Sequence, residues 1–77
     1  MSTQREFLSL NIAVLTVSDS RTLAEDTSGQ LLVDRLEDAG HRCFDRQLVA
    51  DDKYAIRAVT SGWIHDPQCD AVLTTGG

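Results

Sequence analysis

The segment Asn11 to Val17, with the sequence NIAVLTV, decides the fold predicted for this 77-residue chain. It is short, rich in β-branched side chains and almost continuously apolar. A strand with one face in water would instead alternate apolar and polar residues. We therefore predict a strand that is buried on both faces within a parallel sheet.

A helix is predicted downstream of this strand. The polar segment Ser18 to Glu25 is typical of a loop, and Asp26 to Gly29 are residue types that cap helix N-termini. Such a helix start can also receive an anion, although capping is the expected role of Asp26. Gly40 stands where a glycine commonly ends a helix. The helix between these points carries an apolar stripe formed by Leu32, Val33, Leu36 and Ala39.

The rest of the chain repeats the alternation of strand and helix. We predict a second strand from Cys43 to Val49, placed toward an edge of the sheet because several of its residues are polar. A third strand is expected from Ala71 to Thr74, followed by a turn over residues 75–77. The segment Asp66-Pro67 ends the intervening helix, since the residue before proline avoids the helical region. The apolar stripe of that helix is Ile56, Val59, Trp63 and Ile64.

The order strand, helix, strand, helix, strand predicts an α/β fold with a mostly parallel sheet. Residues 1–10 are expected to form an N-terminal tail, and residues 11–77 to belong to one domain. A chain of this size buries only about 60% of its unfolded surface, so its core alone would be marginal. Cys43 and Cys69 are too few for a disulfide scaffold, which leaves a metal or a further polypeptide to complete the core.

Charge and hydropathy argue against two classes of partner. Seven Lys and Arg residues oppose twelve Asp and Glu residues, and the net charge is -5. Nucleic-acid binding needs clustered cations, so no nucleic-acid partner is expected. No apolar run approaches the roughly 20 residues of a membrane-spanning helix, and the polar residues 1–6 do not resemble a signal peptide. We expect a cytoplasmic protein with free thiols at its two cysteines.

Candidate site residues follow each of the three predicted strands. In open α/β sheets, ligands bind beyond the carboxyl ends of the strands, so these segments are expected to converge. The segments are Ser18-Asp19, Asp51-Asp52 and Thr75-Gly76-Gly77.

Each of these segments has a functional and a purely structural interpretation. Asp51 and Asp52 can hold Mg²⁺, which prefers carboxylates and water, or they can cap the second helix. The pair Gly76-Gly77 lets backbone N–H groups approach a phosphate, or it simply forms a turn. Ser18 and Asp19 can bind ligand groups or be ordinary loop residues. The sequence contains no zinc-ligand spacing, nucleophile elbow or P-loop motif.

Four segments in order resemble the molybdenum cofactor biosynthesis protein B family. They are IAVLTVSDSR, DTSGQLLVDRLEDAGH, LVADDKYAIRAVTSGWI and AVLTTGG. The resemblance begins near Asn11 and covers about the first half of a typical family member. It implies a three-layer α/β/α fold that is interrupted here at its third strand.

The resemblance also implies a function. Family members bind molybdopterin, and the adenylyltransferase branch transfers AMP from Mg-ATP to its terminal phosphate. They form trimers, and the B branch sometimes forms hexamers. Thr75, Gly76 and Gly77 match the start of the family's pterin-phosphate loop. Asp51 matches an acidic position that is assigned to Mg²⁺ or catalysis.

Further implications concern the remaining positions and the chain as a whole. Ser18 and Asp19 match the loop that lines the site, whereas Asp52 remains a helix residue. Because the second half of the loop is absent, this chain alone is expected to lack adenylyltransferase activity. A non-catalytic carrier of molybdopterin is the alternative. A receiver-like domain is disfavoured, because Thr74 and Thr75 stand where such a domain has its phosphoacceptor Asp.

Overall fold

The computed structural model describes residues 8–19, 22 and 25–76. Gly77 and most of the expected tail 1–10 lie outside the described residues. The elements are strand β1 (Asn11–Val17), helix α1 (Thr27–Asp38), strand β2 (Arg42–Val49), helix α2 (Lys53–Ile64) and strand β3 (Ala71–Gly76). Their order confirms the predicted alternation, and β1 has the predicted bounds.

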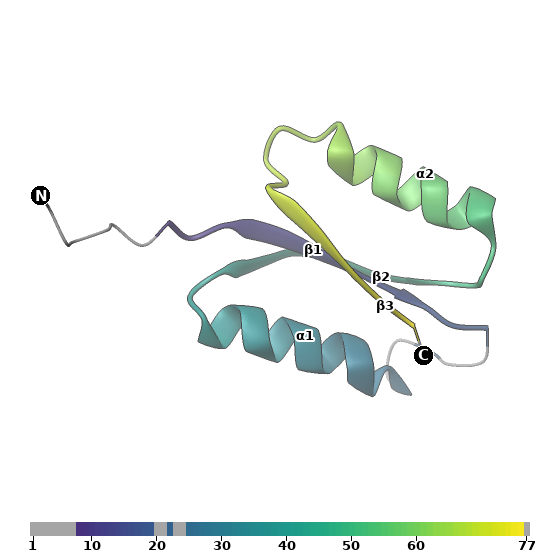
Figure 1. The fold of residues 1–77 in the computed structure, drawn as a ribbon, viewed down its shortest axis with the longest axis horizontal. Coiled ribbons are helices and arrows are strands. Elements are labelled where there is room, and N and C mark those ends of the chain that lie inside the picture. The colour runs from purple at the N-terminus through teal and green to yellow at the C-terminus, as the bar shows by residue number, and fades with distance from the viewer. Residues whose placement is uncertain (1–7, 20–21, 23–24, 77) are drawn as a thin grey trace, which may run out of the picture.

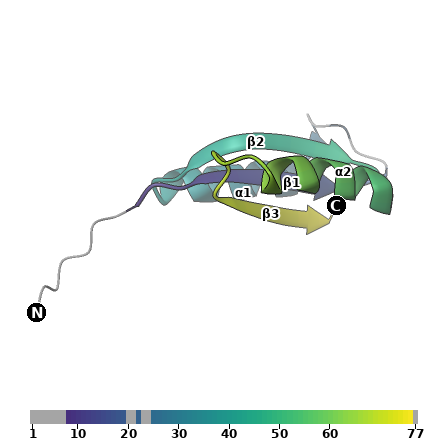
Figure 2. The same ribbon diagram turned by 90° about the horizontal axis from the view of Figure 1, so that it is seen from above.

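The three strands form one parallel sheet in the order β2-β1-β3. Figure 2 shows β1 between its two neighbours, with all three strands pointing the same way. β1 is central because its side chains are apolar on both faces, and five consecutive residues from Ile12 to Thr16 are buried. The more polar β2 lies at one edge of this sheet, as its composition predicted.

The two helices cover opposite faces of the sheet (Figure 1). Ile12 and Val14 of β1 pack with residues of α1, whereas Ala13 and Leu15 pack on the other face with Trp63 of α2. This division follows from the strand geometry, which turns successive side chains to opposite faces. The resulting three-layer α/β/α arrangement confirms the predicted fold class.

The two helices have well-defined ends. Asp26 caps α1 by accepting a hydrogen bond from the Gly29 backbone N–H (2.9 Å). At the other end, Gly40 has a φ of 91°, which a residue with a side chain rarely adopts. The N–H groups of Gly40 and His41 donate to the carbonyls of Glu37 and Leu36, each at 2.9 Å. This pattern is a Schellman motif, and it confirms the predicted role of Gly40.

Two predicted helix-stripe residues are not in the core. Ile64 is 72% exposed, because each helical residue advances by about 100° and Ile64 therefore turns away from its buried neighbour Trp63. Ala39 is the exposed C-cap residue of α1 and lies past its last turn.

The third strand is longer than predicted. Thr75 and Gly76 continue the ladder with β1, where they pair with Thr16 and Val17, instead of beginning a turn. Strand pairing overrides the turn preference of glycine here, because the partner strand extends equally far.

A β-bulge in β2 changes which of its side chains meet α2. Ile12 pairs with Cys43, but Ala13 pairs with Asp45, so Phe44 is the additional residue. Phe44 packs on the α2 face, and Asp45 accepts a hydrogen bond from Trp63 Nε1 on that same face (3.1 Å). The bulge therefore brings a carboxylate to the edge of the α2 core.

Candidate functional site

The carboxyl ends of the three strands align at one edge of the sheet. Val17 pairs with Val49 on one side and with Gly76 on the other. The Ser18 N–H then donates to the Val49 carbonyl (2.8 Å), which holds the start of the first loop against β2. The structure thus brings together the described parts of the three segments that the sequence predicted to converge.

The loops after β1 and β2 lead to helices on opposite faces of the sheet (Figure 1). In folds of this type, ligands usually bind beyond the strand ends where neighbouring connections diverge to opposite faces. Asp19 Oδ1 accepts a hydrogen bond from the Asp51 N–H (2.8 Å), so the two loops are tied together at this point. Both aspartates are exposed, whereas Ser18 is buried.

Asp51 and Asp52 have different structural roles. Asp52 caps α2 by accepting a hydrogen bond from the Tyr54 N–H (2.9 Å), as expected for a helix residue. Asp51 is not the cap, and its contact with Asp19 is made through its backbone N–H. The Asp51 carboxylate therefore does not cap α2, and Asp51 lies just after the carboxyl end of β2.

Asp51, the predicted Mg²⁺ ligand, lies next to Asp19, whose Oδ1 accepts the hydrogen bond from the Asp51 backbone N–H. Mg²⁺ is commonly held by one or two carboxylates, with substrate phosphates and water as its other ligands. Within the described residues, no group of three or more His, Cys, Asp or Glu side chains forms a metal cage. The described residues therefore do not by themselves supply a complete set of ligands for Mg²⁺.

The third predicted segment contributes Thr75 and Gly76. Thr75 is half-buried and Gly76 is exposed, and no atom lies within 4 Å of the position where a Cβ on Gly76 would stand. Space is therefore open on the side of Gly76 where a side chain would stand. The predicted residue Gly77 lies outside the described residues.

Beside this edge lies a buried polar cluster that the sequence does not predict. Asp26 is 2% exposed, although it was expected only to cap a helix. Its carboxylate also accepts hydrogen bonds from Thr16 Oγ1 (2.5 Å) and Arg46 Nη2 (3.3 Å). Burial raises the pKa of Asp26, but the hydrogen bonds from Thr16, Gly29 and Arg46 outweigh it and hold the pKa below its ordinary value. The available signal was Thr16, the one polar residue in the run from Ile12 to Val17.

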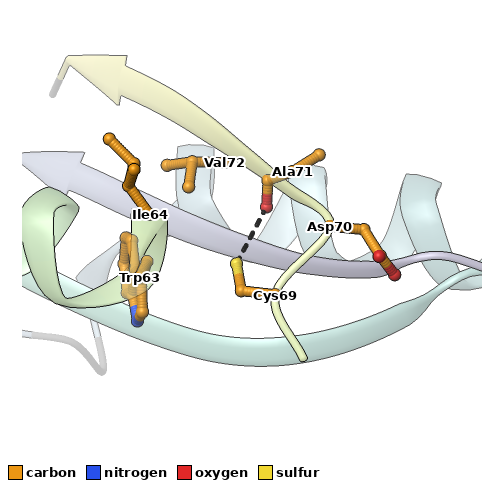
Figure 3. A pocket seen from close by; sticks show the side chains of 6 residues that line it. All are labelled: Trp63, Ile64, Cys69, Asp70, Ala71 and Val72. Carbon is orange, nitrogen blue, oxygen red and sulfur yellow. Dashed lines mark hydrogen bonds between the residues drawn. The ribbon is translucent and has the colours of Figure 1, made fainter. Parts of the chain in front are cut away.

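A second concave region lies away from the candidate site. Residues at the end of α2 and the beginning of β3 surround a cavity of about 300 Å³, and Figure 3 shows Trp63, Ile64 and Val72 around it. The Cys69 thiol donates to the Ala71 carbonyl at its wall (3.4 Å). This cavity is at the amino end of β3, opposite the edge formed by Ser18, Asp51 and Gly76, so it is not part of that site.

The two cysteines are free in the structure. Cys43 packs on the α1 face and Cys69 on the α2 face, so the sheet separates them. Burial, together with the nearby carboxylates of Glu37 and Asp45, raises the pKa of the Cys43 thiol. Neither α1 nor α2, the helices of the described residues, has the length and apolar character needed to cross a bilayer.

A parallel sheet that is covered on both faces defines a class of α/β domain that binds ligands at its carboxyl edge. Residues 13–77 match the family model described as a probable molybdopterin binding domain, and the chain belongs to this family.

The chain is similar to curated proteins named molybdenum cofactor biosynthesis protein B. It is 46% identical to the Escherichia coli (strain K12) protein over 72 residues, which are 94% of this chain and 42% of that protein. Identity to the Bacillus subtilis (strain 168) protein is 48% over 65 residues, or 83% of this chain and 38% of that protein. The chain thus spans about two fifths of the length of these relatives.

A solved structure has the same fold. The crystal structure of a molybdenum cofactor biosynthesis protein B superimposes with a TM-score of 0.85 at 36% identity. The match covers 91% of this chain and 44% of that one. Both the fold and the predicted family are therefore confirmed.

Proposed function

We propose that this chain acts in molybdenum cofactor biosynthesis by binding molybdopterin at the carboxyl edge of its sheet. The supporting observation is the convergence of Ser18, Asp19, Asp51, Thr75 and Gly76 at that edge in a chain of the molybdopterin-binding family. The edge offers exposed carboxylates for a cation and an unobstructed glycine for close approach by a phosphate. Gly77, which follows directly in the sequence, is proposed to extend the phosphate contact.

We further propose that the whole protein adenylylates molybdopterin with Mg-ATP. The terminal phosphate oxygen of molybdopterin attacks the α-phosphorus of ATP and forms a new P–O bond. The bond from that phosphorus to the bridging oxygen breaks, and pyrophosphate leaves with the electron pair. Such a transfer depends on positioning and charge neutralisation.

Asp51 has two proposed roles in this reaction, as the catalytic residue and as a ligand of Mg²⁺. When bound, Mg²⁺ neutralises phosphate charge. Asp51 would orient the cation and would not act as a nucleophile. Its exposed side chain, which leaves the capping of α2 to Asp52, supports these roles.

The experiment compares Asp51→Asn with Asp52→Asn in the whole protein. We expect Asp51→Asn to lower pyrophosphate release about 100-fold or more while molybdopterin binding is retained, as for loss of one group that stabilises transition-state charge. Asp52→Asn is the matched control, because asparagine also caps helices and the neighbouring site is unchanged. Equal activity of both variants would contradict the role of Asp51.

A non-catalytic molybdopterin carrier is the second candidate function. The observation in its favour is that the relatives are named for cofactor biosynthesis and not for a transferase activity. Molybdopterin binding without pyrophosphate release by the unmodified whole protein would establish the carrier. Absence of molybdopterin binding would refute both candidates.

Assembly and location are proposed on the family resemblance alone. We propose a homo-oligomer, a trimer or a hexamer, that works in the cytoplasm with ATP as co-substrate. Light scattering of the whole protein tests the oligomer, and a dissociated monomer at micromolar concentration would refute it.

A further inference from the structure

Asp26 connects three elements at the carboxyl edge of the sheet. Its side chain accepts hydrogen bonds from Thr16 of β1, from the Gly29 N–H of α1 and from Arg46 of β2. Arg46 Nη2 also donates to the Asp26 backbone carbonyl (2.9 Å), and Arg46 Nη1 donates to Gln30 Oε1 (2.8 Å). A helix cap alone requires only the contact with Gly29.

The first turn of α1 lies unusually close to this cluster. A Cβ on Gly29 would stand 2.1 Å from Asp26 Oδ2 and 2.5 Å from Thr16 Oγ1. Such distances are far shorter than van der Waals contact. Glycine is therefore the residue that lets the helix start pack directly against β1 and the buried carboxylate.

The cluster is adjacent to the proposed molybdopterin site. Thr16 pairs in register with Thr75 of β3, and Val17 pairs with Gly76. Paired residues of neighbouring strands present their side chains on the same face, so Thr75 is on the α1 face with Thr16. The helix start that Asp26 anchors thus lies on the face of the sheet onto which Thr75 projects.

We propose that Asp26 is a positioning residue, which fixes the start of α1 against the ends of β1 and β3 so that Thr75 and Gly76 are held in the geometry that binds molybdopterin. The proposal rests on the proposed function for the identity of the ligand. Thr16 and Arg46 act with Asp26, one as the link to β1 and the other as its counter-charge from β2.

The test is a pair of substitutions at Thr16 in the whole protein. Thr16→Val keeps the volume of the side chain but removes the hydroxyl that donates to Asp26. Thr16→Ser keeps the hydroxyl but removes a buried methyl group. If Thr16 acts by positioning through Asp26, Thr16→Val must disturb the site more than Thr16→Ser does. If Thr16 acts only by packing, Thr16→Ser must disturb the site more.

The first readout needs no ligand. In ¹⁵N NMR spectra of the folded, ligand-free protein, we expect Thr16→Val to shift the Thr75 and Gly76 amide signals. We also expect it to speed exchange of the Gly29 amide about ten-fold, in line with the loss of one hydrogen bond to a charged group. Thr16→Ser is expected to preserve the unmodified spectrum at these positions. Unchanged Gly29 exchange in Thr16→Val, or a larger effect of Thr16→Ser, overturns the proposal.

The second readout is the affinity for molybdopterin. We expect Thr16→Val to weaken binding about ten-fold and Thr16→Ser to restore it to within about two-fold. Equal affinities of Thr16→Val and the unmodified protein overturn the positioning role but leave the proposed function standing. If the unmodified protein does not bind molybdopterin, the proposed function fails, and the ligand-free spectra alone decide whether Asp26 positions the strand ends.

Discussion

Gly29 and Gly62 are both helical glycines, but their surroundings are opposite. A Cβ on Gly29 would collide with Asp26 and Thr16, whereas no atom lies within 4 Å of a Cβ on Gly62. We predict that Gly29→Ala lowers the free energy of unfolding by about 1–3 kcal/mol, which is typical of overpacking. Urea denaturation measures it. A neutral or stabilising effect would show that the α1 start can move away from β1 without cost.

Gly62→Ala is the matched control. Gly62 is exposed within α2, so alanine fits there without a clash and removes the entropic cost of fixing glycine in a helix. We predict that it raises the free energy of unfolding by about 0.5–1 kcal/mol. The expected result is that alanine lowers the free energy of unfolding at position 29 and raises it at position 62.

Asp26 gives the fold a defined acid sensitivity. Because its pKa is below the ordinary value of 3.8, the unfolded chain takes up a proton at a higher pH than the folded chain. The stability that Asp26 contributes is therefore present above pH 3.8. It is lost as the pH falls from 3.8 through the lowered pKa of the folded state. We predict that Asp26→Asn lowers the free energy of unfolding at neutral pH and that this loss becomes smaller as the pH falls below 3.8. Urea titrations of both proteins across this range provide the measurement, and a constant difference would contradict the prediction.

At the residue scale, the local role of a residue could be predicted from the sequence more readily than its burial and its distant contacts. The capping roles of Asp26 and Gly40 were predictable because capping depends on a few neighbouring residues. The burial of Asp26 was not, because its partners Thr16 and Arg46 lie ten and twenty residues away and meet it only in the folded sheet. The exposure of Ile64 was not predicted either, because Ile64 lies about 100° around α2 from Trp63 and the sequence does not show how wide an arc of the helix the sheet covers.

The contact between Trp63 and Asp45 joins the end of α2 to β2. Trp63 is buried and donates its indole N–H to Asp45 Oδ2. Burial raises the pKa of Asp45, but hydrogen bonds from Trp63, Gln47 and the Arg46 N–H outweigh it and hold the pKa below its ordinary value. The helix is thus fastened by a hydrogen bond to a charged group in addition to its apolar contacts.

Removing this hydrogen bond should weaken the packing of α2. We predict that Trp63→Phe lowers the free energy of unfolding by about 1–3 kcal/mol, from the lost bond and the lost contact area. A double-mutant cycle with Asp45→Ala, which removes the acceptor of this hydrogen bond, separates the two causes. A coupling energy near zero would assign the whole effect to apolar contact.

At the element scale, the strands and helices were largely predictable, because the short apolar runs of the strands and the 3.6-residue apolar period of the helices are local features of the sequence. The bulge at Phe44 was not, since it is set by the register between two strands that are distant in sequence. The same holds for the extension of β3 to Gly76, which follows from the length of β1. The predicted convergence of the site segments was correct because it depends only on the parallel order of the strands.

The molecule as a whole exposes surface that favours association. Within the described sheet, β3 pairs with β1 on one side and with no strand on the other. Leu73 of this strand and Ile64 of α2 are exposed, and β3 has no lysine or proline to protect its edge. We predict that the 77-residue chain elutes in size-exclusion chromatography above its mass of 8.5 kDa.

Substitutions locate the associating surface. Ile64→Lys combined with Leu73→Lys is expected to restore elution as a monomer, because lysine side chains block edge pairing and remove apolar surface. Tyr54→Lys is the control, since Tyr54 is 69% exposed but lies at the opposite end of α2. Monomeric elution of the unmodified chain would contradict the prediction.

The central position of β1 also has a consequence for the order of assembly. On the β2 side of β1, a hydrogen bond joins Leu10 to His41, which is 31 residues away. On the β3 side, a hydrogen bond joins Asn11 to Asp70, which is 59 residues away. Closing the longer loop costs about 0.6 kcal/mol more per doubling of length, so the unit β1-α1-β2 is favoured to form before β3 docks. We therefore expect β3, the strand that carries Thr75 and Gly76, to join the sheet last. A chain in which β3 has not yet paired would hold Asp26 and its partners in place but would lack Thr75 and Gly76 at the edge of the sheet. The proposed molybdopterin site would then be complete only at the end of folding.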